Sequence, residues 1–513
     1  MTVTLFCKEV RAVLFNSYIF ILLFLPLCLV GYFALNHFRR YTLAMAFLLG
    51  MSLWFYGYFN SSYVLIIVSS IVLNFGMTRI MGRLSGAARK GMLTLALLVN
   101  FGILFYFKYF DFFIGNINTL FAAQLPLKHI VLPLGISFFT FQQVSYVIDA
   151  YRGQTGNYSF LQYAAYVAYF PQLIAGPIVT HDELIPQFLE EARKRFQWEN
   201  FSPGLFLFTL GLAKKVLLAD TFGKVVDWGF GDIPGLGTVS AALVMLAYTF
   251  QIYFDFSGYC DMALGLGKMM NLELPANFDK PYRALSISEF WKRWHKTLTR
   301  FFTRYLYIPL GGSRKGTART CVNVMIVFLC SGLWHGASWN FVIWGGIHGA
   351  CMVFERLLGK RLEKIPGFLR WCGTFLILNL TWVIFRAETL ADAARFFGRL
   401  FAGSPAMGGL TAAFQLPEIT ALFRFGLNRM VPSLMPKLVG AVFYAGALWL
   451  ATRRENAYDA AEDLKFGGVS MVLTAVLLTW CILSFSGTSV PFCISISEEG
   501  SLWKRKKSGA LAF

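Results

Sequence analysis

Long apolar blocks are the feature that most restricts how this chain can fold. Of its 513 residues, 57% are hydrophobic and only 14% are charged, whereas soluble domains are about 45–50% apolar and about 25% charged. The apolar residues lie in continuous blocks, and a helix of about 20 such residues crosses the hydrocarbon of a bilayer. The sequence therefore predicts an all-α polytopic membrane protein without a soluble domain.

The apolar blocks extend over most of the chain. They lie near residues 16–36, 42–59, 62–81, 92–110, 130–148, 160–179, 203–226, 238–260, 320–334, 339–354, 368–385, 437–451 and 467–485. Because some are short or interrupted by Pro and Gly, we expect about eleven transmembrane helices plus re-entrant pieces. The more polar segment 387–436 is predicted to be an interfacial amphipathic helix followed by a loop, since four apolar residues recur in it at helical spacing: Leu390, Ala394, Phe397 and Phe401.

The distribution of basic residues predicts the orientation. Arg39 and Arg40 follow the first block, the next loop is uncharged, and the third loop carries Arg79, Arg83, Arg89 and Lys90. Cytoplasmic loops are enriched in Lys and Arg, so this alternation places the N-terminus outside and the basic C-terminus inside, which requires an odd number of spans. We assign residues 13–487 to the membrane domain, residues 1–12 to an N-terminal extension that an over-called start would explain, and residues 488–513 to a basic tail.

Composition and motifs also exclude several functions. The net charge of +19 does not indicate a nucleic-acid partner, because the basic residues lie between apolar blocks, where they meet lipid headgroups or an anionic cytosolic substrate. The nine cysteines include no Cys-x-x-Cys pair, so neither a disulfide framework nor a metal site is expected. The sequence also lacks a phosphate-binding P-loop, a Gly-x-Ser-x-Gly nucleophile elbow and a His-Glu-x-x-His zinc helix.

His335 is the strongest candidate functional residue. It lies in Trp334-His335-Gly336, between two apolar stretches that are each shorter than a comfortable span. An ionisable residue at membrane depth is costly and is a functional candidate by default, and histidine suits proton transfer near neutral pH. The alternative is a hydrogen-bonded core histidine beside a close helix crossing at Gly332 and Gly336. The residues alone leave both readings open.

A second candidate is the segment that follows Ser286. Ser286 and Glu289 have the spacing of a capping box, so a helix is predicted to begin there. One face of that helix would carry Trp291, His295, Leu298 and Phe302, and another would carry Lys292, Lys296, Arg300 and Arg304. The cationic face suits lipid headgroups or the phosphates of a cytosolic cofactor. A plain interfacial anchor helix is the reading that these residues favour by themselves.

Other polar residues in apolar surroundings are given structural roles. Asp255 and Asp261 could orient a histidine or pair with an arginine, but we favour a polar helix terminus paired within the bundle. His348 and His37 are expected to pack or to lie at an interface. His181-Asp182-Glu183 is metal-capable, although a carboxylate-rich turn is the favoured reading.

Six segments carry a resemblance by their order along the chain: Phe15-Asn16-Ser17, Leu132 to Phe138, Phe170 to Pro177, Tyr253 to Gly258, Trp291 to His295, and Ser331 to Gly336. In this order they resemble the membrane-bound O-acyltransferase (MBOAT) family, and most of all its bacterial branch that contains alginate O-acetyltransferase and the D-alanyl transfer membrane protein. The resemblance implies an enzyme with a ring of tilted helices around a central tunnel that joins a cytosolic donor site to an outward acceptor site. It implies that His335 is the catalytic base and that His295 orients the acceptor or His335, or stabilises the oxyanion.

By the same resemblance, we expect an O-acetyltransferase of the bacterial inner membrane that acts in alginate or other exopolysaccharide biosynthesis. The donor would be acetyl-CoA or a similar acyl thioester, with no permanently bound cofactor and no metal. From their charge, Lys292, Arg293 and Lys296 are predicted to contact the phosphates of CoA. The expected partners are membrane lipid, a periplasmic or extracellular acetyltransferase protein, and a polysaccharide or envelope-polymer acceptor. The alternatives are a transporter or flippase, or a non-catalytic scaffold of an export complex.

Overall fold

The computed structural model describes residues 15–405, 409–410, 435–464 and 467–486, and every regular element within these ranges is helical. By length and composition, seven helices can cross a membrane: Phe20–His37, Ser61–Met81, Gly86–Phe121, Thr238–Met269, Gly316–His335, Trp339–Leu358 and Gly367–Arg386. Lys437–Thr452 and Gly468–Leu483 are shorter apolar helices. The all-α polytopic prediction is confirmed. The count of about eleven spans and the ring remain predictions, and residues 1–12 and 488–513 lie outside the described ranges.

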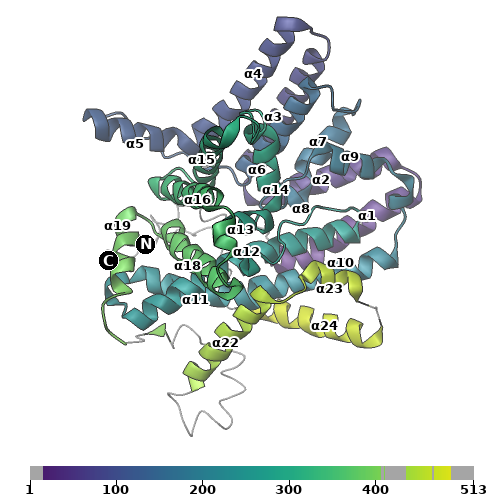
Figure 1. Cartoon of the computed structure of the whole chain (residues 1–513). Helices are drawn as coiled ribbons and strands as arrows, with labels where there is room; N and C mark the ends of the chain where they lie inside the picture. The colour runs from purple at the N-terminus through teal and green to yellow at the C-terminus, as the bar shows by residue number, and fades with distance from the viewer. Residues whose placement is uncertain (1–14, 406–408, 411–434, 465–466, 487–513) are drawn as a thin grey trace, which may run out of the picture.

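Figure 1 shows how the helices are arranged. The longer elements are α1 (Leu25–His37), α2 (Tyr41–Phe59), α3 (Ser61–Met81), α4 (Gly86–Leu104), α5 (Phe110–Phe121), α6 (Ile136–Tyr151), α10 (Trp198–Ala213), α11 (Asp220–Gly231), α12 (Thr238–Met269), α15 (Gly316–His335), α16 (Trp339–Leu358), α18 (Gly367–Arg386), α22 (Met435–Thr452) and α24 (Gly468–Leu483). Shorter helices are α7 (Phe160–Ala168), α8 (Phe170–Leu173), α9 (His181–Leu189), α13 (Ile287–Arg293), α14 (Lys296–Phe302), α19 (Leu390–Arg399) and α23 (Ala457–Asp463). Helices α4 and α5 extend away from the body, whereas α13 lies near its centre (Figure 1).

Small residues allow the central helices to pack closely. Gly204 and Gly211 of α10 face Gly265 and Gly258 of α12, and a Cβ at any of the four would lie 2.6–2.8 Å from a carbonyl oxygen of the opposite helix. Close approach at small residues is the usual packing mode of membrane helices, because lipid provides no hydrophobic driving force between them. Helix α12 is consequently the most buried of the candidate spans.

Polar side chains join α3, α4 and α6 inside the bundle. Asn100 of α4 donates to Asn74 Oδ1 of α3 at 2.6 Å, and Asn74 donates to Gln143 Oε1 of α6 at 3.0 Å. All three side chains are buried. Hydrogen bonds of this kind fix neighbouring membrane helices relative to one another. They therefore hold α4, and the segment that continues from it, against α6.

A glycine contact also sets the geometry of α15 and α16. A Cβ on Gly332 would overlap the Phe341 carbonyl oxygen, and a Cβ on Gly345 would overlap that of Phe328. The two backbones therefore touch at the last turn of α15, which ends at His335. The expected close crossing at Gly332 is thus present.

This contact makes a stability prediction. Replacing Gly345 by alanine should lower the thermal stability of the folded protein in detergent, since overpacking a close contact costs about 1–3 kcal/mol. Gly346→Ala is the matched control: its Cβ would meet only Leu329 Cδ2 at 3.6 Å, so the gain in helix propensity should leave stability unchanged or higher. Equal melting temperatures for the two variants, measured by size-exclusion chromatography after heating, would contradict the packing account.

The helix predicted to begin after Ser286 is shorter than expected. Ser286 Oγ accepts from Glu289 N at 3.0 Å, as predicted, but Glu289 Oε2 accepts from Leu285 N, so only half of the capping box forms. Helix α13 ends at Arg293, and α14 begins at Lys296. The two predicted continuous stripes are therefore wrong. The chain breaks because the backbone of 277–279 takes over the hydrogen bonding: Arg293 O accepts from Asp279 N, and Lys296 N donates to Asn277 O, both at 2.9 Å.

The polar segment after α18 begins with the expected helix but with a different buried face. Thr389 Oγ1 accepts from Asp392 N and caps α19. Ala393 and Phe396 are buried, whereas Ala394 is exposed and Phe401 lies beyond the helix and is 87% exposed. The predicted stripe was wrong by about one residue, because Phe396 stacks on Phe230 of α11 at 4.9 Å. The loop predicted up to residue 436 falls largely outside the described residues.

The two aspartates of α12 are paired within the bundle, as favoured, but not at a helix terminus. Asp255 accepts from Lys215 at 2.7 Å, and Asp261 accepts from Lys214 at 2.5 Å. Both carboxylates lie inside a helix of 32 residues. Pairing of buried charges in this way removes most of the cost of placing them in the bundle. The partners are lysines of the π-helical segment η4 (Lys214–Ala219), not an arginine or a histidine.

Candidate active site

His335 is the last residue of α15, and aromatic rings from three helices surround it. The imidazole centroid lies 4.9 Å from the Trp334 ring, 5.3 Å from the Trp344 ring of α16 and 5.4 Å from the Phe385 ring of α18. The helix ends here because Gly336 is extended and a second helix begins at Trp339. The chain therefore breaks directly after His335, and the ring lies between α15, α16 and α18.

Three buried nitrogens at His335 have no hydrogen-bond partner within the part of the chain that the structure describes. His335 Nε2, Trp334 Nε1 and Trp344 Nε1 are all buried without a partner among the described residues. Buried polar atoms are hydrogen-bonded in the large majority of cases, and exceptions indicate a functional site or a bound molecule. Three such nitrogens on neighbouring rings therefore indicate a binding site for a polar ligand.

His348 provides an internal comparison, because it lies on α16 and is fully buried. Its Nδ1 accepts from Trp291 Nε1 at 3.3 Å, and its Nε2 lies 3.1 Å from Thr381 Oγ1. Both nitrogens are thus used in packing the helices together, as predicted for this residue. In His335, by contrast, Nε2 has no hydrogen-bond partner among the described residues, and a general base needs such a free nitrogen.

His295 occupies the break between α13 and α14. Its φ of 46° lies in the left-handed region, which is costly for a residue with a side chain and is retained where the surroundings fix it. The fixing residue is Asn277, whose Oδ1 accepts from Thr297 N at 3.2 Å and from Thr297 Oγ1 at 2.8 Å. The same oxygen lies 3.2 Å from His295 Nδ1.

These contacts determine the tautomer of His295. A backbone N–H can only donate, so the Thr297 contact identifies the Asn277 atom as the oxygen, and His295 Nδ1 must then carry the proton. Burial lowers the pKa of His295 to about 3, so the ring is neutral at physiological pH. A neutral ring protonated on Nδ1 leaves Nε2 as a hydrogen-bond acceptor.

The two candidate histidines are linked through Trp334. The His295 ring lies 5.9 Å from the Trp334 ring, which in turn lies 4.9 Å from the His335 ring. Within the described ranges no hydrogen bond joins the two imidazoles directly. The structure therefore brings both predicted residues to one site, with an indole between them.

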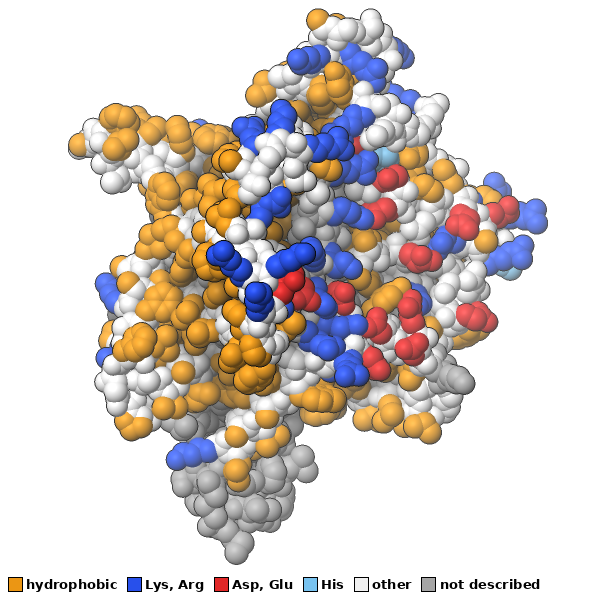
Figure 2. All heavy atoms as spheres, in the orientation of Figure 1, with side chains coloured by type: hydrophobic (Ala, Val, Ile, Leu, Met, Phe, Trp, Pro, Cys, Tyr) orange, Lys and Arg blue, Asp and Glu red, His pale blue; other side chains and the backbone are white. Residues whose placement is uncertain are grey.

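The three cations predicted to meet CoA lie on α13 and at the start of α14. Lys292 and Lys296 are exposed. Arg293 is half-buried, pairs with Glu289 at 2.8 Å and donates to Asp279 O at 3.2 Å. Figure 2 shows one face of the molecule, on which Lys and Arg gather with acidic residues over the middle and right, whereas the left part is largely hydrophobic. Because Lys292 and Lys296 are exposed and Arg293 is already paired with Glu289, the two lysines are better placed to meet an anionic ligand.

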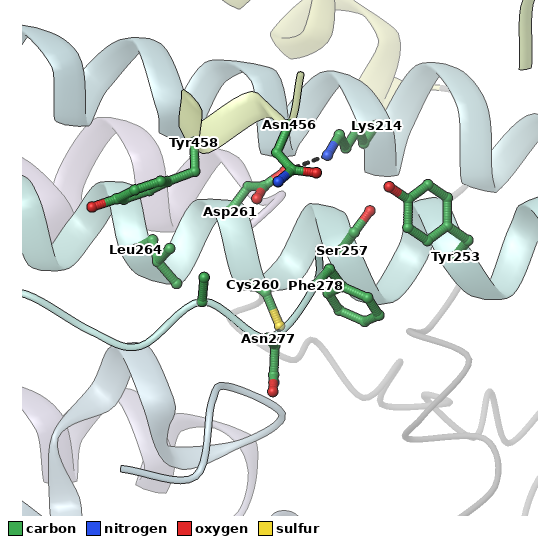
Figure 3. A pocket seen from close by; sticks show the side chains of 11 residues that line it. Lys214, Tyr253, Ser257, Cys260, Asp261, Leu264, Asn277, Phe278, Asn456 and Tyr458 are labelled. Carbon is green, nitrogen blue, oxygen red and sulfur yellow. Dashed lines mark hydrogen bonds and ion pairs between the residues drawn. The ribbon is translucent and has the colours of Figure 1, made fainter. Parts of the chain in front are cut away.

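A small hollow, with room for about one water molecule, lies behind Asn277, between α12 and the start of α23 (Figure 3). Asn277 Nδ2 donates to Cys260 Sγ at 3.5 Å at one side, and the Lys214–Asp261 pair lies at the other. Ser257 Oγ is buried there without a partner among the described residues. The hollow thus connects to His295 through a single side chain.

Two residues of the site were missed by the sequence analysis. Asn277 was assigned no role from the sequence, although its oxygen organises the break at His295. Lys108 lies in the predicted block 92–110 and was not considered, although a lysine in an apolar block is itself a signal.

The metal-capable group at His181 forms the first turn of α9 instead of a loop turn, and the described residues contain no cluster that could hold a metal ion.

Comparison with known proteins identifies the family. The sequence profile of the membrane-bound O-acyltransferase family matches residues 89–385, which include both histidines. The chain is 41% identical to the peptidoglycan O-acetyltransferase of Helicobacter pylori, over 75% of this chain and 79% of that protein. It is 40% identical to a probable alginate O-acetylase of Pseudomonas aeruginosa, over 75% and 74%, and 25% identical to the teichoic acid D-alanyltransferase of Bacillus subtilis, over 50% and 67%.

The fold, the site and these relatives define a multi-pass membrane acyltransferase. The chain belongs to the membrane-bound O-acyltransferase family. By their names, these relatives are an O-acetyltransferase of peptidoglycan, a probable O-acetylase of alginate and a D-alanyltransferase of teichoic acid.

Proposed function

We propose that the protein transfers an acetyl group from a cytosolic acyl thioester, such as acetyl-CoA, to a hydroxyl for the O-acetylation of an exported polysaccharide or another envelope polymer. The observation that carries the proposal is the buried Nε2 of His335, which, like the two indole nitrogens beside it, has no hydrogen-bond partner among the described residues. A lone pair left free at the end of a membrane helix suits a general base.

The reaction needs one proton acceptor and one leaving thiol. The acceptor hydroxyl attacks the thioester carbonyl carbon while His335 Nε2 takes its proton. The carbon–sulfur bond then breaks, and the proton passes from His335 to the departing thiolate. General-base catalysis of this kind contributes about 10²–10⁴-fold to the rate.

His295 has a narrower role in this proposal than the resemblance implied. Its Nδ1–H is engaged by Asn277, so its Nε2 can accept a hydrogen bond but cannot donate one to an oxyanion. We propose that it accepts a hydrogen bond from a second hydroxyl of the acceptor and so orients the reacting hydroxyl, whose own proton goes to His335. The Trp334 Nε1–H, a donor without a partner in the described structure, suits the developing negative charge on the carbonyl oxygen.

The donor is proposed to approach from the charged face. Lys292 and Lys296, which are exposed on this face, meet its phosphates. We place this face in the cytoplasm and the protein in the bacterial inner membrane, with the N-terminus outside and the C-terminus cytoplasmic. A periplasmic or extracellular acetyltransferase protein completes the transfer to the polymer.

A deletion strain tests this function. Mass spectrometry of its envelope polymers should show the loss of an acetyl ester that returns when the wild-type gene is restored. An unchanged ester content in the deletion strain would overturn the proposal. A transporter or flippase instead predicts polymer movement in vesicles that lack any acyl thioester. A scaffold predicts that the ester is lost in the deletion strain but kept in a strain in which only His335 is substituted.

A further inference from the structure

Lys108 is a charged residue within a candidate membrane span. It lies in the π-helical segment η2 (Phe105–Tyr109), which joins α4 and α5 inside the apolar helix Gly86–Phe121. Charged residues at this depth are rare and mark functional sites, and π-helical insertions are frequent at such sites. Two independent features of the sequence and backbone therefore point to the same residue.

The contacts of η2 are directed at the end of α15. Lys108 Nζ donates to the carbonyl oxygen of Trp334 at 2.6 Å and to Ser137 Oγ of α6 at 3.0 Å. Tyr109 OH donates to the carbonyl oxygen of Leu333 at 3.0 Å. Consecutive residues of η2 thus bind consecutive carbonyls, and the next residue of α15 is His335.

These bonds have a clear physical role. The last four carbonyls of an α-helix have no partner within the helix, and a cation is favoured at that end by the helix dipole. Lys108 supplies both the hydrogen bond and the charge. It also lies 5.7 Å from the centre of the Trp334 ring, so the indole beside His335 is held at its backbone and its face.

We propose that Lys108 is a positioning residue for acyl transfer: it fixes the last turn of α15 so that the His335 imidazole faces the reacting groups. The inference rests on the proposed role of His335 as base. The hydrogen bonds among Asn74, Asn100 and Gln143 hold α4 against α3 and α6. The segment η2, which continues from α4, is therefore fixed by contacts within the bundle and not by lipid.

The test compares Lys108→Met, Lys108→Arg and Lys128→Met in membrane vesicles supplied with [14C]acetyl-CoA. Lys128 is exposed and stacks on Tyr106 and Phe110, so its substitution removes the same charge outside the site. We expect Lys108→Met to lower kcat about ten- to a hundredfold, as a small misplacement of a catalytic group does, with the KM for acetyl-CoA within about twofold of wild type. Lys108→Arg should restore part of kcat, and Lys128→Met should behave as wild type.

Rates are normalised to the folded protein measured by size-exclusion chromatography. A kcat of Lys108→Met within about twofold of wild type, a loss matched by Lys128→Met, or a loss confined to KM would each overturn the inference. Combining Lys108→Met with His335→Gln separates it from the proposed function. If Lys108 acts through His335, the double variant is no slower than His335→Gln alone. If His335→Gln is itself active, the proposed function fails whatever Lys108 does.

Discussion

Replacing His335 by glutamine is expected to lower kcat for acetyl transfer by about 10²–10⁴-fold, the contribution of a positioned general base. Glutamine keeps a polar side chain of similar length but cannot accept the hydroxyl proton at neutral pH. Binding of the donor does not require that proton, so its KM should change little. Initial rates of [14C]acetyl transfer in membrane vesicles, at equal amounts of folded protein, measure both quantities.

His348→Gln is the control for this variant. The imidazole of His348 is buried in the neighbouring helix, and both of its nitrogens are hydrogen-bonded. Its removal should therefore lower stability and leave kcat per folded molecule close to wild type. If the two variants lose kcat equally, the free Nε2 of His335 does not distinguish a base from a packing residue, and the assignment fails.

The second large effect is expected at His295 and Asn277. His295→Ala removes the proposed hydrogen-bond acceptor for a second hydroxyl of the substrate, which orients the reacting one. Asn277→Ala leaves the His295 Nδ1–H and the two Thr297 donors without their common acceptor, at a cost of about 1–3 kcal/mol for each buried donor left unsatisfied. Both variants should therefore slow transfer, and Asn277→Ala should also lower thermal stability.

A double-mutant cycle tests whether the two residues act together. Groups in contact show interaction energies of about 0.5–3 kcal/mol, whereas distant groups are additive. The activity loss of the combined variant should therefore be smaller than the sum of the two single losses. Strict additivity of the activation free energies would show that Asn277 does not act through His295.

The sequence predicted the features that depend on local pattern. The apolar blocks indicated the helices, the spacing of Ser286 and Glu289 indicated a helix start, and the glycines beside His335 indicated a close helix crossing. Each of these follows from composition or spacing within about 20 residues.

The remaining features depend on contacts between distant segments. The break at His295 is stabilised by Asn277, 18 residues away, and the end of α15 is held by Lys108, 226 residues from Trp334. The buried face of α19 is set by Phe230 of α11. No periodicity in a single sequence contains such pairings, because tertiary contacts override local preference.

The acetyl-ester content of envelope polymers from cells that carry His335→Gln, at the membrane level of the wild-type protein, tests the role of His335 most directly. The account predicts no ester above that of the deletion strain. Wild-type ester content in these cells would contradict it.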